Sequence, residues 1–389
     1  MTPAARVQAA IEILDEYLAG KPAEQALTGW ARRSRYAGSG DRAAVRDHVF
    51  DALRNTRSFA AVGGAMTGRG LMLGAARLAE QDLDTLFSGA TYAPTPLSPA
   101  ERDSGHPPKP GAEALDLPDW LMGDFSGSLG DNAEAVAEVL KQRAPVHLRV
   151  NTAKMTRSAA QGLLREEGIT CVPHAAADTA LEVKEGARRI RNSQAYRDGV
   201  VELQDAASQA AVQMLPLRDG MRVLDFCAGG GGKALAMAAR AGIELYAHDA
   251  DPARMSDLPK RAARAGIEVK ILKSGDLQPA GPFDLVLCDV PCSGSGTWRR
   301  APHGKWSLTP ETLDRLRNSQ AQILCEAADI VAPNGVLAYM TCSLLEVEND
   351  AQVSVFTEKT RNWVLQSKRS WSLLDGTDGF FTAHLKRLD

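Results

Sequence analysis

From Val200 to the end of the 389-residue chain, short hydrophobic runs alternate with segments that have helical spacing. Strands that alternate with helices form a parallel sheet, because each helix carries the chain back to the edge where the next strand begins. This alternation therefore predicts an α/β fold with one seven-stranded sheet over residues 196–389. The runs predicted as strands are 222–226, 244–248, 268–272, 283–288, 336–341, 363–367 and 379–385.

A glycine-rich run follows the first predicted strand and opens a helix. Without a Cβ, its backbone amides can approach a ligand closely, but many nucleotide sites share such a loop. Asp249 ends the second strand, where a carboxylate can accept hydrogen bonds from both hydroxyls of a ribose. A dinucleotide dehydrogenase would show a similar pair, although nothing downstream predicts hydride chemistry. The run consists of Cys227, Ala228, Gly229, Gly230, Gly231, Gly232 and Lys233.

Two cysteines stand just after the fourth and fifth predicted strands. Cys292 lies in an Asp-x-Pro-Cys-Ser-Gly motif that begins at Asp289, and Cys342 lies in a Tyr-x-Thr-Cys-Ser motif. Carbon 5 of a pyrimidine becomes nucleophilic enough to take a methyl group only after a thiolate has added to carbon 6. A cysteine after a strand is usually a small buried hydrophobic residue. Two of them at the ligand-binding edge of a sheet instead favour catalysis.

Together these motifs resemble the RsmB/NOP/NSUN family of RNA cytosine-5 methyltransferases, and most of all its RsmB branch, which acts on 16S rRNA. The resemblance implies a class I S-adenosylmethionine-dependent fold, a Rossmann-like sheet whose last strand is antiparallel, and a role in rRNA processing. It also implies that Cys342 is the nucleophile, that Cys292 assists elimination, and that Asp289 holds the cytosine edge. DNA cytosine-5 methyltransferases instead attack with the Pro-Cys cysteine, which would reverse these roles.

The resemblance also implies a binding site for S-adenosyl-L-methionine. The glycine-rich run 227–233 and Asp249 would hold the cofactor, Asp276 would face its adenine side, and Asp289 would border it. The family usually has a proline in place of Gly230 and a threonine in place of Ala234. These departures keep open a different class of function, an RNA-binding ribosome-assembly factor without turnover. Within the enzyme class, tRNA is the second candidate substrate.

The residues before the sheet predict two further domains joined by a linker. Residues 1–90 have helical spacing throughout, and the segment 41–46 resembles a helix start in the NusB-like RNA-binding domain of the RsmB branch. Residues 91–116 are rich in proline and predict a linker. Residues 117–195 mix helical spacing with short runs typical of strands, and residues 148–152 match a family segment in an RRM-like α+β subdomain. From the pattern alone, without the downstream motifs, an ordinary α+β cap is the preferred interpretation.

The net charge of −3 excludes polyanion binding through global charge, so any affinity for RNA must come from local groups. The residues that follow the Pro-Cys motif predict a segment that grips phosphate groups, and a second basic cluster lies near the N-terminus. The predicted RNA-binding residues are Arg149, Arg299, Arg300 and Lys305, and the N-terminal cluster is Arg32, Arg33 and Arg35.

The remaining expectations concern location and other ligands. No apolar stretch approaches the roughly 20 residues that span a bilayer, and the first residues lack a signal-peptide core, so we expect a cytoplasmic protein without a membrane partner. The six cysteines do not have the spacing of a disulfide framework or a zinc site, so no metal is expected. A monomer is the working expectation.

Overall fold

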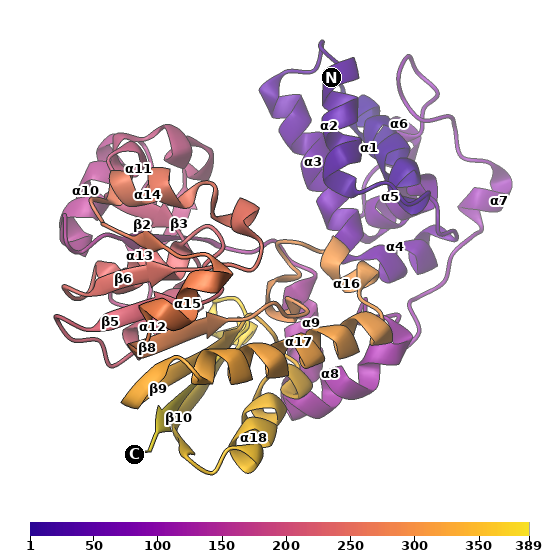
Figure 1. Ribbon diagram of the computed structural model, residues 1–389. Coiled ribbons are helices and arrows are strands. Elements are labelled where there is room, and N and C mark those ends of the chain that lie inside the picture. Colours follow the sequence, from indigo (N-terminus) through magenta and orange to yellow (C-terminus); the bar gives the residue numbers. More distant parts are fainter. Residues whose placement is uncertain (389) are drawn as a thin grey trace. The chain divides into compact units, whose positions relative to one another are not determined.

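The computed structural model describes residues 1–388, and the chain divides into two compact units (Figure 1). A helical unit contains Met1–Arg143 together with Trp298–Ser307. An α/β unit contains Ala144–Thr297 and the chain from Leu308 onward. In the described residues, no helix is long and apolar enough to cross a membrane.

The helical unit is built around a core of aliphatic side chains from its first five helices. Ile11, Leu14, Val49, Leu53 and Leu71 are almost completely buried in that core. This confirms the all-α prediction for the front of the chain, while its likeness to NusB stays a prediction. The helices are α1 Pro3–Leu18, α2 Ala23–Arg33, α3 Ser39–Arg54, α4 Thr56–Gly63, α5 Gly68–Leu78, α6 Leu83–Leu86, α7 Pro99–Arg102, α8 Met122–Leu129 and α9 Ala133–Leu140.

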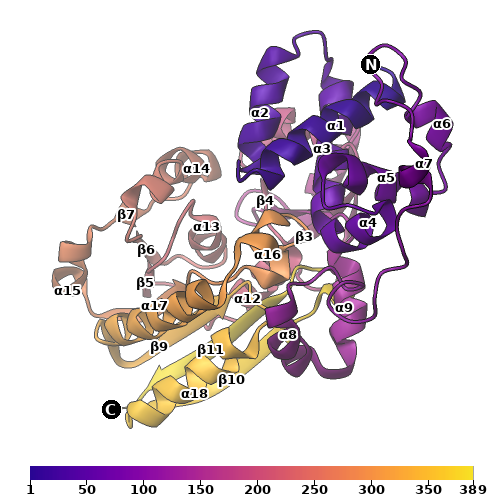
Figure 2. The same cartoon turned by 90° about the vertical axis from the view of Figure 1, so that its right-hand side faces the viewer.

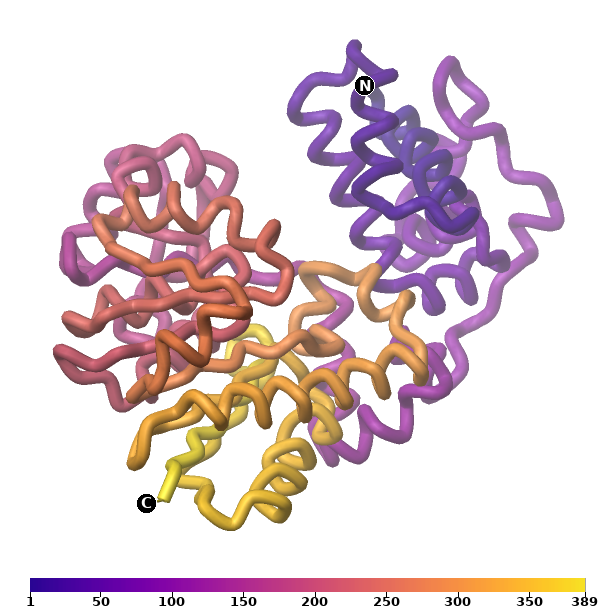
Figure 3. The backbone as a smooth tube through the Cα atoms, in the orientation of Figure 1, coloured from indigo at the N-terminus to yellow at the C-terminus, as the bar shows by residue number. Residues whose placement is uncertain are grey.

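A segment from far along the sequence completes the helical unit. Residues 298–307, which include the short helix α16 (His303–Ser307), pack against the end of α3; both stretches can be followed in Figure 3. The Arg54 side chain donates a hydrogen bond to the Arg299 carbonyl at 2.7 Å, and the Trp306 indole donates to the Leu53 carbonyl, also at 2.7 Å. The segment after the Pro-Cys motif is thus part of the helical unit.

The compact units differ from the predicted domain boundaries in two places. Helices α8 and α9 group with the N-terminal helices, whereas the sequence analysis placed them in the domain that begins at residue 117. At the other end, strand β4 (Val201–Leu203) pairs with β1 (Val146–Val150), so the small sheet runs past residue 195. Both differences arise because hydrophobic spacing along the chain does not say which elements pack together.

The small sheet of the α/β unit is antiparallel and has the strand order β2-β3-β1-β4. Its other strands are β2 (Thr170–Pro173) and β3 (Ala180–Glu185), and the helices α10 (Arg157–Glu166) and α11 (Gln194–Arg197) accompany it. Leu148, Leu164 and Leu181 are fully buried in its core. This agrees with the predicted α+β subdomain.

The large sheet has seven strands in the order β10-β11-β9-β8-β5-β6-β7. All seven predicted strands are present, and β11 runs antiparallel to both of its neighbours, as expected for the last strand of a class I methyltransferase fold. The strands are β5 Arg222–Asp225, β6 Glu244–Ala247, β7 Lys270–Ile271, β8 Phe283–Asp289, β9 Val331–Thr341, β10 Trp363–Trp371 and β11 Phe380–Arg387.

Helices cover both faces of the large sheet, because successive side chains of each strand point to opposite faces. Val286 belongs to one hydrophobic cluster with α17 (Pro310–Ala328) and α18 (Asp350–Lys359). Its neighbour Leu287 belongs to another cluster, with α12 (Ala206–Gln213) and α13 (Gly232–Ala238). In Figure 2, α17 and α18 lie along β9 and β10. Two shorter helices, α14 (Leu258–Ala265) and α15 (Leu277–Ala280), follow β6 and β7.

Candidate active site

The two motif cysteines lie in contact at one edge of the large sheet. β8 and β9 are adjacent parallel strands, so their carboxyl ends deliver Cys292 and Cys342 to the same place. The two Sγ atoms are 3.5 Å apart, within hydrogen-bond range for sulfur, and both residues are partly accessible. The structure thus brings the two cysteines that the sequence predicts as catalytic residues together at this edge.

The hydrogen bond between the thiols affects the protonation of Cys292. It raises the pKa of Cys292 well above its ordinary value, and burial raises that pKa further. A thiol with a raised pKa stays protonated near neutral pH. Cys292 is therefore a neutral thiol, and either Sγ atom can donate the hydrogen bond that joins the pair.

A buried ion pair lies beside the cysteines. The Lys233 Nζ atom donates a hydrogen bond to Asp289 Oδ2 at 2.5 Å, which joins the glycine-rich loop to the end of β8. Burial alone would lower the pKa of Lys233, but the Asp289 carboxylate, with smaller contributions from Cys342 and Asp225, raises it above its ordinary value. Lys233 is therefore a fixed positive charge at the site.

Asp225, which the sequence analysis did not select, is the most strongly perturbed carboxyl group of this region. It ends β5 with 1% of its surface exposed, and its Oδ1 atom has no hydrogen-bond partner. Burial, with a contribution from the nearby Asp289 carboxylate, raises its pKa to about 7. A buried acceptor without a partner at the end of a parallel strand fits a site that receives a polar ligand group.

The glycine-rich loop and Asp249 are joined by hydrogen bonds. The Gly229 amide donates to Asp249 Oδ2 at 2.9 Å, and the Asp251 amide donates to Asp249 Oδ1 at 3.0 Å. Each carboxylate oxygen keeps further acceptor capacity for a ribose hydroxyl. Gly231 has a φ of +78°, and a Cβ there would lie 2.2 Å from the Leu258 side chain. Any other residue at position 231 would distort the loop.

A pocket of about 290 Å³ adjoins this loop. Cys227, a predicted cofactor residue, forms part of the pocket wall. The other lining residues were not among the predicted cofactor residues. Burial raises the pKa of the Cys227 thiol, so it behaves as an apolar wall residue rather than a nucleophile. The remaining lining residues are Phe226, His248, Ala250, Ser274, Leu277, Gln278, Ile323, Glu326, Asp329 and Ile330.

The other predicted cofactor residues lie in or near this site. Ala228 is buried and donates its amide to the His248 carbonyl, and the Gly230 carbonyl accepts a hydrogen bond from Arg261. Gly232 begins α13. Asp276 is exposed and accepts a hydrogen bond from the Lys273 amide, while Ser274 and Leu277 on either side of it line the pocket.

Three of the four predicted RNA-binding residues are buried, which contradicts a role in gripping phosphate from the surface. Arg149 is 4% exposed and donates hydrogen bonds to Gln204 Oε1 at 2.7 Å and to the Gly232 carbonyl at 2.6 Å, so it supports the cofactor loop. Arg299 and Lys305 are 3% and 1% exposed. Arg300 is half-buried.

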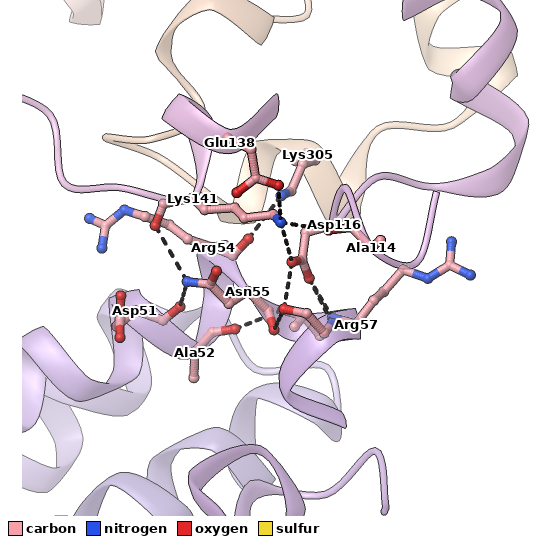
Figure 4. Close-up of polar contacts among 12 residues, drawn as sticks. Asp51, Ala52, Arg54, Asn55, Arg57, Ala114, Asp116, Glu138, Lys141 and Lys305 are labelled. Carbon is pink, nitrogen blue, oxygen red and sulfur yellow. Dashed lines mark hydrogen bonds and ion pairs between the residues drawn. The ribbon is translucent and has the colours of Figure 1, made fainter. Parts of the chain in front are cut away.

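Lys305 belongs to a buried polar cluster of the helical unit, shown in Figure 4. Its Nζ atom donates to the Arg54 carbonyl at 3.1 Å, and Asp116 supplies the opposite charge. Asp116 accepts hydrogen bonds from the Arg57 and Ser58 amides at the start of α4. Burial lowers the pKa of Lys305 to about 8. Its role is structural.

No group of histidine, cysteine and acidic residues within residues 1–388 is arranged to hold a metal ion. All six cysteines are free.

Two family models match the chain. One, described as 16S rRNA methyltransferase RsmB/F, matches residues 212–386, and the other, described as an RsmF/B-like ferredoxin-like domain, matches residues 117–188. The ribosomal RNA small subunit methyltransferase B of Salmonella arizonae is 30% identical over 282 residues, which cover 69% of this chain and 66% of that protein. The match thus spans slightly less than two thirds of this relative.

Solved structures share the fold. The crystal structure of a protein named PH0851 covers 100% of this chain and 99% of its own, with a TM-score of 0.77 and 24% identity. A methyltransferase homologue from Pyrococcus horikoshii covers 71% of this chain and 97% of its own, with a TM-score of 0.62 and 24% identity.

Proposed function

The chain belongs to the 16S rRNA methyltransferase RsmB/F family, and from this premise we propose that it methylates carbon 5 of a cytosine in small-subunit ribosomal RNA. The observation that supports this reaction most strongly is the 3.5 Å separation of the Cys292 and Cys342 Sγ atoms. Two thiols in contact at the ligand edge of the sheet suit a reaction that needs one sulfur to attack and another to assist release.

Cys342 is the nucleophile in this proposal. In this proposal Cys342 loses its proton to water and adds to carbon 6 of the cytosine as the thiolate, while Cys292 keeps its own proton at this stage. The addition places electron density on carbon 5, which can then form a bond to the methyl carbon of the donor, S-adenosyl-L-methionine; the bond from that carbon to the donor sulfur would break, and S-adenosylhomocysteine would leave. The fixed positive charge of Lys233 lies on the same side and favours the thiolate.

Cys292 completes the reaction by removing the proton from carbon 5. Its pKa is raised first of all by the hydrogen bond to Cys342. Once Cys342 is a neutral thioether on carbon 6, that cause disappears, and the partly accessible Cys292 can lose its proton to water. The Cys292 thiolate then takes the carbon-5 proton, the electron pair of that C–H bond restores the double bond, and the bond between Cys342 and carbon 6 breaks.

S-adenosyl-L-methionine, the methyl donor in this proposal, fits the site that lies beside the cysteines. Asp249 would accept hydrogen bonds from the ribose hydroxyls, the pocket next to Cys227 would receive the adenine, and Asp225 would accept a hydrogen bond from the charged amino group. Asp289 stands between Lys233 and the cysteine loop, where it would hold the cytosine edge.

The experiment that tests the proposed function is incubation with methyl-labelled S-adenosyl-L-methionine and separate fractions of unmodified 16S rRNA and tRNA. Nucleoside mass spectrometry of the products should find 5-methylcytidine in the 16S fraction. Label in tRNA alone would favour the tRNA alternative. RNA binding without label in either fraction would favour an assembly factor that has lost turnover.

A further inference from the structure

Glu348 is a fully buried carboxyl group that the proposed reaction does not use. It lies in the short 3-10 helix Glu346–Glu348, six residues after Cys342, and none of its surface is exposed. An unpaired buried carboxylate is costly, so its hydrogen-bond partners show what it stabilises.

Its partners come from the loops that carry both cysteines. The Ser293 amide donates to Glu348 Oε1 at 2.8 Å, and the Ser293 hydroxyl donates to Oε2 at 2.5 Å. The Ser343 hydroxyl donates to the same Oε2, also at 2.5 Å. Ser293 directly follows Cys292 and Ser343 directly follows Cys342, so one carboxylate joins the residues next to the two thiols.

Further contacts make this connection rigid. The Gln320 side chain of α17 donates to Glu348 Oε1 at 3.0 Å and to the Pro291 carbonyl at 3.0 Å. The Gly296 amide donates to the Cys342 carbonyl at 2.9 Å, which ties the two loops a second time. A network centred on Glu348 thus joins the two cysteine loops beyond the ends of the strands.

We propose that Glu348 is a positioning residue that holds the thiols of Cys292 and Cys342 in contact. Its relevance to catalysis rests on the proposed function, because only a reaction that uses both sulfurs depends on their separation. Without the carboxylate, two serine hydroxyls and one amide lose their shared acceptor, and the two cysteine loops are held together less firmly, by the remaining contacts such as that of the Gly296 amide with the Cys342 carbonyl.

The test measures thiol proximity directly, without RNA or methyl donor. Phenylarsine oxide forms two As–S bonds with a pair of neighbouring thiols and releases one water molecule, so it binds tightly only where both sulfurs are already close. Mass spectrometry and competition with a small dithiol give its affinity. We expect tight binding to the wild-type protein, binding at least tenfold weaker to Glu348→Ala, and no bridged product with Cys292→Ala.

Two further variants separate positioning from general destabilisation. Glu346→Ala changes an exposed residue of the same short helix and should bind the arsenical like the wild-type protein. Glu348→Gln keeps the shape of the side chain and one acceptor oxygen, so it should bind the arsenical several-fold more weakly than the wild-type protein and more tightly than Glu348→Ala. If the alanine variant does not fold, Glu348→Gln replaces it in the comparison. Wild-type affinity in either folded Glu348 variant would overturn the proposal.

A second readout connects positioning to turnover. In the methylation assay, Glu348→Ala should lower kcat at least tenfold with KM for RNA within about twofold of the wild-type value, because the residue does not face the substrate. If the wild-type protein makes no 5-methylcytidine but Glu348→Ala still loses arsenical affinity, the positioning role stands and the proposed function fails. If methylation is normal and neither kcat nor arsenical affinity changes in the variant, the positioning role fails.

Discussion

Replacing Asp249 with alanine tests the cofactor site, since this carboxylate has two tasks at once. Its side chain is buried, and its two oxygens accept hydrogen bonds from the Gly229 and Asp251 amides. Arg254 Nη1 lies 3.3 Å from Asp249 Oδ2 and forms an ion pair with it. In the proposed site, the remaining acceptor capacity would bind the ribose hydroxyls. The substitution therefore removes the ribose contacts and also frees the loop that shapes the site.

The expected loss of affinity follows from these contacts. A hydrogen bond to a charged group contributes about 1.5–3 kcal/mol, and losses at one residue are not additive. The freed Gly229 amide adds the cost of ordering the loop when ligand binds, so we expect the upper end of this range, about 3 kcal/mol. That value corresponds to a dissociation constant raised roughly a hundredfold. Asp249→Asn can satisfy only one of the two amides and should lose about tenfold.

Isothermal titration calorimetry with S-adenosylhomocysteine measures these changes. Asp251→Ala is the matched control, because it removes an exposed carboxylate from the same loop, and its affinity should stay within about twofold of wild type. Circular dichroism establishes that each variant is folded. A folded Asp249→Ala protein with wild-type affinity would refute the assignment of this loop to the cofactor.

Three other predictions concern the helical unit. Changing the exposed Arg32 and Arg35 to glutamate should weaken RNA binding and lower the slope of log K against log salt, measured by filter binding; an unchanged slope would exclude this cluster from the interface. Asp116→Ala leaves buried amides without an acceptor and should cost about 3 kcal/mol in chemical denaturation, whereas Asp119→Ala, whose side chain is 81% exposed, should cost less than about 1 kcal/mol. In the folded protein the pKa of Lys305 is lowered to about 8, from the ordinary lysine value of 10.5. Between these two pH values the unfolded chain therefore binds more protons than the folded protein. The free energy of unfolding should rise with pH across that window, by up to roughly 3 kcal/mol. Lys305→Met should remove this rise, and an unchanged pH dependence of unfolding would show that Lys305 does not cause it.

The large sheet could be predicted because most of its strands contain a short apolar run, and such a run is a local signal in the sequence. The cysteine pair could be predicted because the carboxyl ends of parallel strands meet at one edge, which topology alone determines. Asp249 followed from the same rule. In these cases the property that matters lies within a few residues of the chain.

The misassigned residues depend on partners that are distant in sequence. Lys305 and Arg299 look like exposed cations, but both are buried in the helical unit, where Asp116 supplies the charge opposite to Lys305. Arg149 is buried against a loop more than eighty residues away. Glu348 was missed for the same reason: its partners Ser293 and Gln320 lie in other elements. The charge of a side chain is a property of the residue, whereas its exposure is a property of the fold.

The division of labour between the cysteines is the central claim, and trapping the covalent complex tests it most directly. Each variant is incubated with 16S rRNA and S-adenosyl-L-methionine and analysed by denaturing electrophoresis. Cys292→Ala should accumulate a protein–RNA complex because attack proceeds and release fails, and the complex should vanish in Cys292→Ala/Cys342→Ala. Cys342→Ala should form no complex and no 5-methylcytidine. A complex that accumulates with Cys342→Ala instead would assign the attack to Cys292 and contradict the account.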